Sequence, residues 1–338
     1  MREHSLEENS NLEAANGRVH AGAYVKPVVF IHTNAKQLLG AKVGAHLLKT
    51  RSKTPDAFEV RLLRLEETAH LHRRGGQTYL RKGQLAIWRN EDLQSFSPLR
   101  MLIPQAMNFR GRALVLDPDV FAIGDVCELL DSDMQGKAIR CRHVAGGYRG
   151  NGRRFHASSV MLLDCARLVH WKWDEQIDAM FEKTLDYGRW ISLALEDPES
   201  IGEIPEEWNH FDTLTAETRL LHNTERSTQP WKTGLPIDFG TTTTRRGRRS
   251  GWIRGKLSSW GLGDGGAVPL SHYRAHPDPN QERLFLESVR DCLDQGVLDE
   301  GFVRSEIEQG HVRADLLERV RGLGEKPASD RTVTSNHG

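Results

Sequence analysis

The sequence has few cysteines, no excess of charge of either sign and no long apolar run. Only Cys127, Cys141, Cys165 and Cys292 occur in 338 residues, and no two of them form a C-x-x-C pair. This spacing excludes a zinc knuckle and a disulfide framework, so we expect buried free thiols in a reducing cytoplasm. Lysine plus arginine equals aspartate plus glutamate at 46 each, so the overall charge does not favour nucleic-acid binding. No stretch approaches the ~20 apolar residues of a membrane span.

Apolar segments of strand type alternate with a helical pattern in the first part of the chain. Residues 26–33 and 58–65 read as strands, and the leucines and valine of 34–50 lie at helical spacing. Strand, helix and strand in this order favour a parallel sheet. We predict further strands at 112–116 and 157–164 and a helix that starts within 165–171. The expected fold class is therefore α/β, with ligands bound outside the carboxyl ends of the strands.

Polar residues stand at the ends of two of these strands. His32, Thr33 and Asn34 end the first, and Asp117-Pro118-Asp119 follows the third. Mg²⁺ and Mn²⁺ prefer oxygen ligands, and a D-x-D with a central proline supplies two carboxylates on a restricted backbone. Residues 131–133 form a second D-x-D, so the pattern alone is weak, and the alternative is a solvated turn.

The segment 95–130 resembles glycosyltransferase family 8, which contains glycogenin and bacterial lipopolysaccharide galactosyl- and glucosyltransferases. The matching features, in the family's order, are Ser97, Arg100, Ile103-Pro104, Asp117-Pro118-Asp119, Gly124-Asp125 and Leu129-Leu130. Segments 157–171, 204–211 and 222–232 resemble later motifs, so the resemblance covers roughly residues 26–234. It implies a GT-A type, Rossmann-like nucleotide-diphospho-sugar transferase fold. It also implies retaining, metal-dependent transfer of a hexose from a nucleotide-sugar donor, usually a UDP-sugar.

The resemblance also assigns roles to individual residues. The family's metal ligands fall on Asp117, Asp119 and His222, and two carboxylates with one imidazole favour Mn²⁺ over Mg²⁺. Donor contacts fall on His32, Thr33, Asn34, Pro118 and Arg100, although Arg100 could instead form an internal ion pair. The residues that face the transferred sugar are matched by Glu196 and Asp197, in the weakest part of the alignment.

Several positions depart from the family pattern. Gln229 stands where a lysine is expected, and Lys232 is the candidate replacement cation for the donor diphosphate. Ala157-Ser158-Ser159 replaces an Asn-x-Gly, which puts the contacts to sugar or acceptor in doubt. Two alternatives therefore stay open: a sugar nucleotidyltransferase, and a non-catalytic nucleotide-binding relative that acts through a partner.

We expect a disordered leader (1–25), a glycosyltransferase domain (26–239), a basic linker (240–275), a helical extension (276–322) and a disordered tail (323–338). One helix should start after Asp278 and end near Gly296. Residues 245–260 combine arginines with tryptophans, which suits either peripheral contact with an anionic membrane or a solvated linker. The expected location is cytoplasmic, with peripheral attachment to the inner face of the membrane as a further hypothesis. The acceptor would be a glycan, lipid or protein, as in lipopolysaccharide or other cell-surface polysaccharide synthesis, and the oligomeric state is open.

Overall fold

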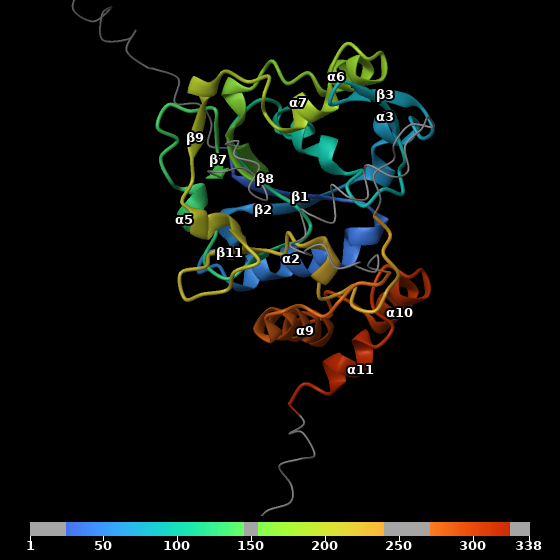
Figure 1. Ribbon diagram of the computed structural model, residues 1–338. Coiled ribbons are helices and arrows are strands. Elements are labelled where there is room, and N and C mark those ends of the chain that lie inside the picture. Colours follow the sequence, from blue (N-terminus) through green and yellow to red (C-terminus); the bar gives the residue numbers. More distant parts are fainter. Residues whose placement is uncertain (1–24, 145–154, 240–270, 325–338) are drawn as a thin grey trace, which may run out of the picture.

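The structure is a computed structural model in which residues 25–144, 155–239 and 271–324 are described (Figure 1). The predictions for the leader, for the basic and aromatic segment 245–260 and for nearly all of the tail lie outside these residues. Within them, no helix combines the length and the apolar character that a membrane crossing requires.

A six-stranded mixed sheet forms the centre of the molecule, which confirms the predicted α/β class. Its order is β2-β1-β5-β8-β7-β9, and β1 is parallel to both β2 and β5. Strand β8 is antiparallel to β5 and β7, whereas β9 is parallel to β7. The strands are β1 (Val28–Thr33), β2 (Glu59–Arg64), β5 (Arg112–Leu116), β7 (Ile139–Val144), β8 (Phe155–Asp164) and β9 (Ile201–Glu203).

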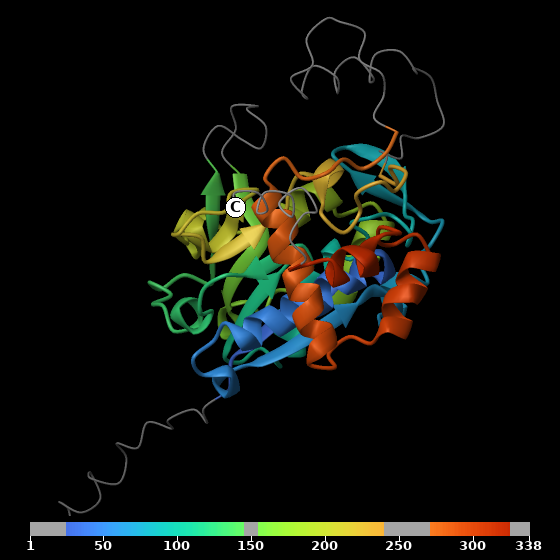
Figure 2. The same cartoon turned by 90° about the horizontal axis from the view of Figure 1, so that it is seen from below.

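Helices cover both faces of this sheet. On one face α2 (Leu38–Thr50) packs beside α9 (Pro279–Asp294), with α10 (Glu300–Glu308) and α11 (Leu316–Arg321) further out (Figure 2). Their apolar side chains form one continuous core with those of the sheet, so the predicted helical extension packs as part of the same body. The opposite face carries a second core beneath α6 (Trp173–Phe181) and α7 (Tyr187–Ile191). The remaining elements named here are α3 (Ala69–His72), β3 (Thr78–Arg81), β4 (Gln84–Ile87), α4 (Ile103–Ala106), β6 (Val120–Ala122), α5 (Cys127–Leu130), β10 (His210–Phe211) and β11 (Leu220–His222).

Local sequence signals explain both ends of α9. Asp278 caps α9 by accepting a hydrogen bond from the Asn280 amide, and Gly296 takes a φ of 71° just past its end. The helix expected to start within 165–171 does not form there. Cys165–Arg167 form only a single 3₁₀ turn, capped by Asp164, and α6 begins later, at Trp173.

The Asp-Pro-Asp turn rests directly on α2. A Cβ on Gly40 would lie 2.7 Å from the Pro118 carbonyl oxygen, and one on Gly44 would lie 3.1 Å from that of Val120. Two glycines one helical turn apart therefore let the helix approach the turn at backbone distance. This contact positions the Asp-Pro-Asp turn relative to α2.

Strand β8 is irregular where it passes this turn. Cys141 of β7 pairs with Met161, but the next residue, Arg142, pairs with Ala157. Ser158, Ser159 and Val160 are thereby skipped on the β7 side. A bulge of this kind re-aims side chains, and here it presents Ser158 and Ser159 to the turn after β5.

Candidate functional site

Two short strands bring a distant histidine to the Asp-Pro-Asp turn. Strand β6 begins directly after Asp119, and β11 pairs with it antiparallel so that His222 lies opposite Val120. The Asn223 amide then donates to the Asp119 carbonyl oxygen at 3.1 Å. As a result, Asp117, Asp119 and His222 each place a ligand atom within 4.8 Å of the other two.

Asp117 is held as an anion by a buried pair of donors. Arg100 Nη2 and His32 Nε2 each lie 2.8 Å from its Oδ1, and Arg100 Nη1 also donates to Ser158 Oγ at 2.5 Å. Burial raises the pKa of Asp117, but the Arg100 charge and the His32 hydrogen bond outweigh it and lower that pKa to about 2. Burial lowers the pKa of His32, so this ring is a neutral donor. Arg100 therefore lies in an internal ion pair and also lines the cavity described below.

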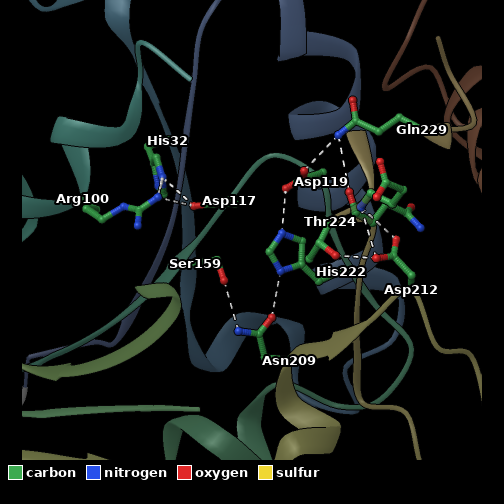
Figure 3. Close-up of polar contacts among 12 residues, drawn as sticks. His32, Arg100, Asp117, Asp119, Ser159, Asn209, Asp212, His222, Thr224 and Gln229 are labelled. Carbon is green, nitrogen blue, oxygen red and sulfur yellow. Dashed lines mark hydrogen bonds and ion pairs between the residues drawn. The ribbon is translucent and has the colours of Figure 1, made fainter. Parts of the chain in front are cut away.

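The ring of His222 is oriented by an amide that links it to the β8 bulge. His222 Nδ1 lies 2.9 Å from Asn209 Oδ1, and Asn209 Nδ2 donates to Ser159 Oγ at 3.1 Å (Figure 3). Because the Asn209 oxygen accepts from Nδ1–H, the other ring nitrogen, Nε2, is left to face Asp119 at 3.2 Å. A ring held in one tautomer by such a partner is the usual arrangement for a metal-binding histidine.

The donor set fits a divalent cation. Asp119 Oδ1 is buried and has no hydrogen-bond partner, and it faces the Nε2 of His222. Two lone pairs at this distance repel unless a cation or a proton lies between them. Two carboxylates and one imidazole suit Mn²⁺ or Mg²⁺, with the nitrogen favouring Mn²⁺.

In the absence of a metal, the same geometry favours a proton on His222. Burial lowers the pKa of His222, but the charge of Asp119 and its contact with the ring outweigh burial, so that the pKa lies above its usual value. This ion pair stabilises the metal-free fold fully below the unfolded-state pKa, and the stabilisation is lost as the pH rises through the higher folded-state pKa.

Metal binding should have the opposite pH dependence. A cation on Nε2 must displace this proton, so apparent Mn²⁺ affinity should fall about tenfold per pH unit below the pKa of His222 and level off above it. Calorimetric Mn²⁺ titrations across the pH range would measure this, with His222→Gln as the control that loses the slope. A wild-type affinity independent of pH would exclude His222 as a ligand.

A cavity of about 300 Å³ opens over the two carboxylates. Its wall includes Ser158 and Ser159 from the bulge and three arginines, Arg81, Arg100 and Arg226. Among the described residues, neither Arg81 nor Arg226 forms an ion pair with a carboxylate. They stack instead on Tyr187 and Phe239, respectively. Two guanidiniums without an ion-paired carboxylate among the described residues, beside a cation site, suit an anionic ligand such as a diphosphate.

The predicted donor contacts at the end of β1 lie behind this cavity rather than on its wall. His32, Thr33 and Asn34 are almost fully buried and do not line it. Asn34 Nδ2 donates to Ser95 Oγ at 2.9 Å and to the Asp92 carbonyl oxygen at 3.0 Å, while His32 supports Asp117. Pro118 is also absent from the wall, because its carbonyl faces Gly40. These four residues shape the site without facing the cavity.

Three other expectations differ from the observed placement. Glu196 accepts from Trp171 Nε1 at 2.9 Å and lies 2.8 Å from His170 Nε2, and Asp197 caps a 3₁₀ turn. Neither carboxylate lines the cavity. Lys232 is 1% exposed, with Nζ 3.5 Å from Asp238 Oδ2, and also lies off the wall. The motif resemblance predicts that these residues face the donor, but in the structure their side chains make local contacts away from the cavity.

Gln229, in the expected lysine position, points at the site. Its Nε2 donates to Asp119 Oδ2 at 3.0 Å, which leaves Oδ1 as the open oxygen (Figure 3). The departure therefore replaces a cation by a neutral donor that orients a carboxylate.

Sequence reasoning did not assign a role to Asn209, Arg81 or Arg226. Asn209 and Arg226 lie inside segments that resemble family motifs, so their neighbourhood was signalled but their contacts were not. Arg81 ends the first strand of an isolated two-stranded hairpin, and nothing in the local sequence indicates that this hairpin reaches the cavity.

No family model matches the chain, and no curated protein sequence matches it. Similar solved structures include the galactosyltransferase LgtC in complex with donor and acceptor sugar analogues. It is 15% identical, with a TM-score of 0.39, and the match covers 72% of this chain and 97% of that one. The glycosyltransferase GlyE of Streptococcus pneumoniae is 14% identical, with a TM-score of 0.42 and coverages of 80% and 64%. Mouse xyloside xylosyltransferase 1 is 15% identical, with a TM-score of 0.38 and coverages of 58% and 97%. At this level of likeness, these structures do not establish an activity for this chain.

Proposed function

We propose that this protein is a metal-dependent glycosyltransferase that takes a hexose from a nucleotide-sugar donor. One observation carries the proposal: ligand atoms of Asp117, Asp119 and His222 converge beneath a cavity lined by arginines. The motif resemblance supports a UDP-sugar, Mn²⁺ and retention at the anomeric carbon. It also supports a cell-surface glycan, such as a lipopolysaccharide, as the acceptor.

Asp117, Asp119 and His222 would hold the metal, which acts as a Lewis acid that neutralises negative charge on the departing diphosphate. Arg100 and His32 keep Asp117 ionised, and Asn209 keeps His222 Nε2 available. Arg81 and Arg226 stand on the wall where the diphosphate oxygens would lie. The serines of the bulge supply neutral donors beside them.

A second candidate is a nucleotide-binding relative without transferase activity. Asp117 and Asp119 are the only carboxylates among the described residues that line the cavity, and both belong to the metal group. The described part of the wall therefore offers no separate carboxylate to serve as a base or nucleophile. Gln229 in place of a cation points in the same direction.

The two candidates separate in a turnover assay. We expect release of UDP from at least one of a panel of UDP-sugars with Mn²⁺ present, and no release with EDTA. UDP binding that requires Mn²⁺ but never yields free sugar or product would favour the second candidate. Formation of nucleoside triphosphate from donor and pyrophosphate would instead identify a nucleotidyltransferase, and no binding of any nucleotide would contradict all three.

A further inference from the structure

A second group of metal-type ligands lies across two strands of the sheet. Cys141 and His143 come from β7 and His156 from β8, and each offers a ligand atom within 4.8 Å of the other two. Strands β7, β8 and β9 lie together at one side of the sheet (Figure 1). This group shares no residue with the Asp117–Asp119–His222 group.

The pairing of β7 and β8 places the two histidines directly opposite each other. His143 lies directly opposite His156, and their ring centroids are 4.6 Å apart. The register shift falls between Cys141 and Arg142, next to the thiol. If the register of residues 142–144 continued, Cys141 would pair with Ser158. The shift pairs it with Met161 instead.

One ring nitrogen of His143 is free to bind a ligand. Its Nδ1 lies 3.9 Å from Glu203 Oε2 on the neighbouring strand β9. Its Nε2 is buried and has no hydrogen-bond partner. The contact with Glu203 is too long for a hydrogen bond, but it places a carboxylate on the side of the ring where metal-binding histidines usually have a partner.

We propose that Cys141, His143 and His156 form a binding site for a zinc-type divalent cation within the sheet. A thiolate with two imidazoles is a softer donor set than the first site and selects Zn²⁺ or Co²⁺ over Mn²⁺ and Mg²⁺. With bonds of about 2.3 Å to sulfur and about 2.0 Å to nitrogen, a tetrahedral ion separates its ligands by roughly 3.3–3.6 Å. The three atoms therefore need to approach one another by at most about 1.5 Å, which side-chain rotation can supply.

Binding at this site requires the thiol to lose its proton. Burial raises the pKa of the Cys141 thiol to about 12, so the cation must displace one proton from sulfur at neutral pH. The bound ion would tie β7 to β8 beside the bulge that presents Ser158 and Ser159 to the first cavity. His156 also lines that cavity, so the two sites are neighbours, but this proposal does not depend on the proposed transferase function.

Cobalt substitution tests the site directly. Titrating the metal-free full chain with Co²⁺ should produce a thiolate-to-metal charge-transfer band that saturates at one ion per chain. Zn²⁺ should abolish this band. His143→Ala should weaken Co²⁺ binding by more than the roughly 10–100-fold that loss of an outer-shell partner costs.

Matched variants identify the thiol. Cys141→Ser should remove the band, whereas Cys165→Ser, which alters another fully buried thiol, should retain it. Asp119→Asn should also retain it, because oxygen and nitrogen ligands give no thiolate band, and this separates the proposal from the fate of the transferase site. Should Cys141→Ser fail to fold, His143→Ala carries the test. A wild-type protein without the band, a band that survives loss of Cys141, or a Co²⁺ affinity that is unchanged by loss of His143 would overturn the proposal.

Discussion

Replacing Asp119 with asparagine should abolish Mn²⁺-dependent binding of UDP and leave the fold intact. The substitution keeps the shape of the side chain and can keep the hydrogen bond from Gln229. It removes the anionic oxygen that faces His222, and with it the main cause that raises the pKa of that ring. Changes to partners outside the ligand set already cost about 10–100-fold in metal affinity, so losing a charged ligand should cost at least that much.

Calorimetric titration of UDP, first with Mn²⁺ and then with EDTA, measures this on wild type and variant. The chain contains its own control, since Asp131 begins a second D-x-D and its side chain is exposed. Asp131→Asn should bind UDP like the wild type. If wild-type binding ignores the metal, or if Asp119→Asn binds as well as wild type, residues 117–119 form only a turn and the proposed function loses its main support.

The strands that carry the site could be predicted because their apolar runs have few alternatives. Residues 112–116 became β5 without change, and Asp117 follows it as expected. The parallel pairs β1–β2 and β1–β5 follow from the strand–helix–strand order. Local rules also gave α9, where an N-cap aspartate and a terminating glycine bracket a periodic apolar face.

Much of the site depends on pairings that local sequence does not encode. His222 reaches Asp119 only because β11 pairs with β6 across about a hundred residues, and the motif resemblance, rather than periodicity, suggested it. The β8 bulge contains no glycine or proline from which it could be predicted. It nevertheless places Ser158 beside Arg100 and Ser159 beside Asn209. For Glu196 the motif resemblance predicts that the side chain faces the transferred sugar. In the structure it accepts a hydrogen bond from Trp171 and does not line the cavity.

The C-terminal helices, which the sequence predicts as a helical extension, also contribute to the site. Gln281 on α9 accepts from Asn223 Nδ2 at 2.8 Å and donates to the Asp212 carbonyl oxygen at 2.9 Å. Asn223 in turn follows His222 and bonds to the backbone of Asp119. Helix α9 therefore supports the loop that positions His222, so this helix contributes to the geometry of the site.

Replacing Arg100 with methionine should destabilise the protein by about 3–5 kcal/mol, because it strands a buried carboxylate. Asp117 is 7% exposed, and its low pKa depends first on the Arg100 charge. Because that pKa is lowered, the pair stabilises the fold above the unfolded-state pKa of Asp117, and this contribution disappears as the pH falls through about 2. His32 remains beside Asp117 in the variant, and removal of the Arg100 charge favours its protonated form, so the loss should fall at the lower end of the range.

Urea unfolding of Arg100→Met, Asp117→Asn and the double variant separates the ion pair from packing. If the stranded charge causes the loss, Asp117→Asn should recover much of it in the Arg100→Met background, since an amide needs no counter-charge. Arg61→Met is the matched control, because Arg61 pairs with Glu59 where both side chains are nearly half exposed, and such pairs contribute at most about 1 kcal/mol. Equal losses in Arg100→Met and the double variant would mean that Arg100 stabilises through packing alone. His32 would then be the residue that keeps Asp117 ionised, and Arg100 would not be required to keep this metal ligand charged.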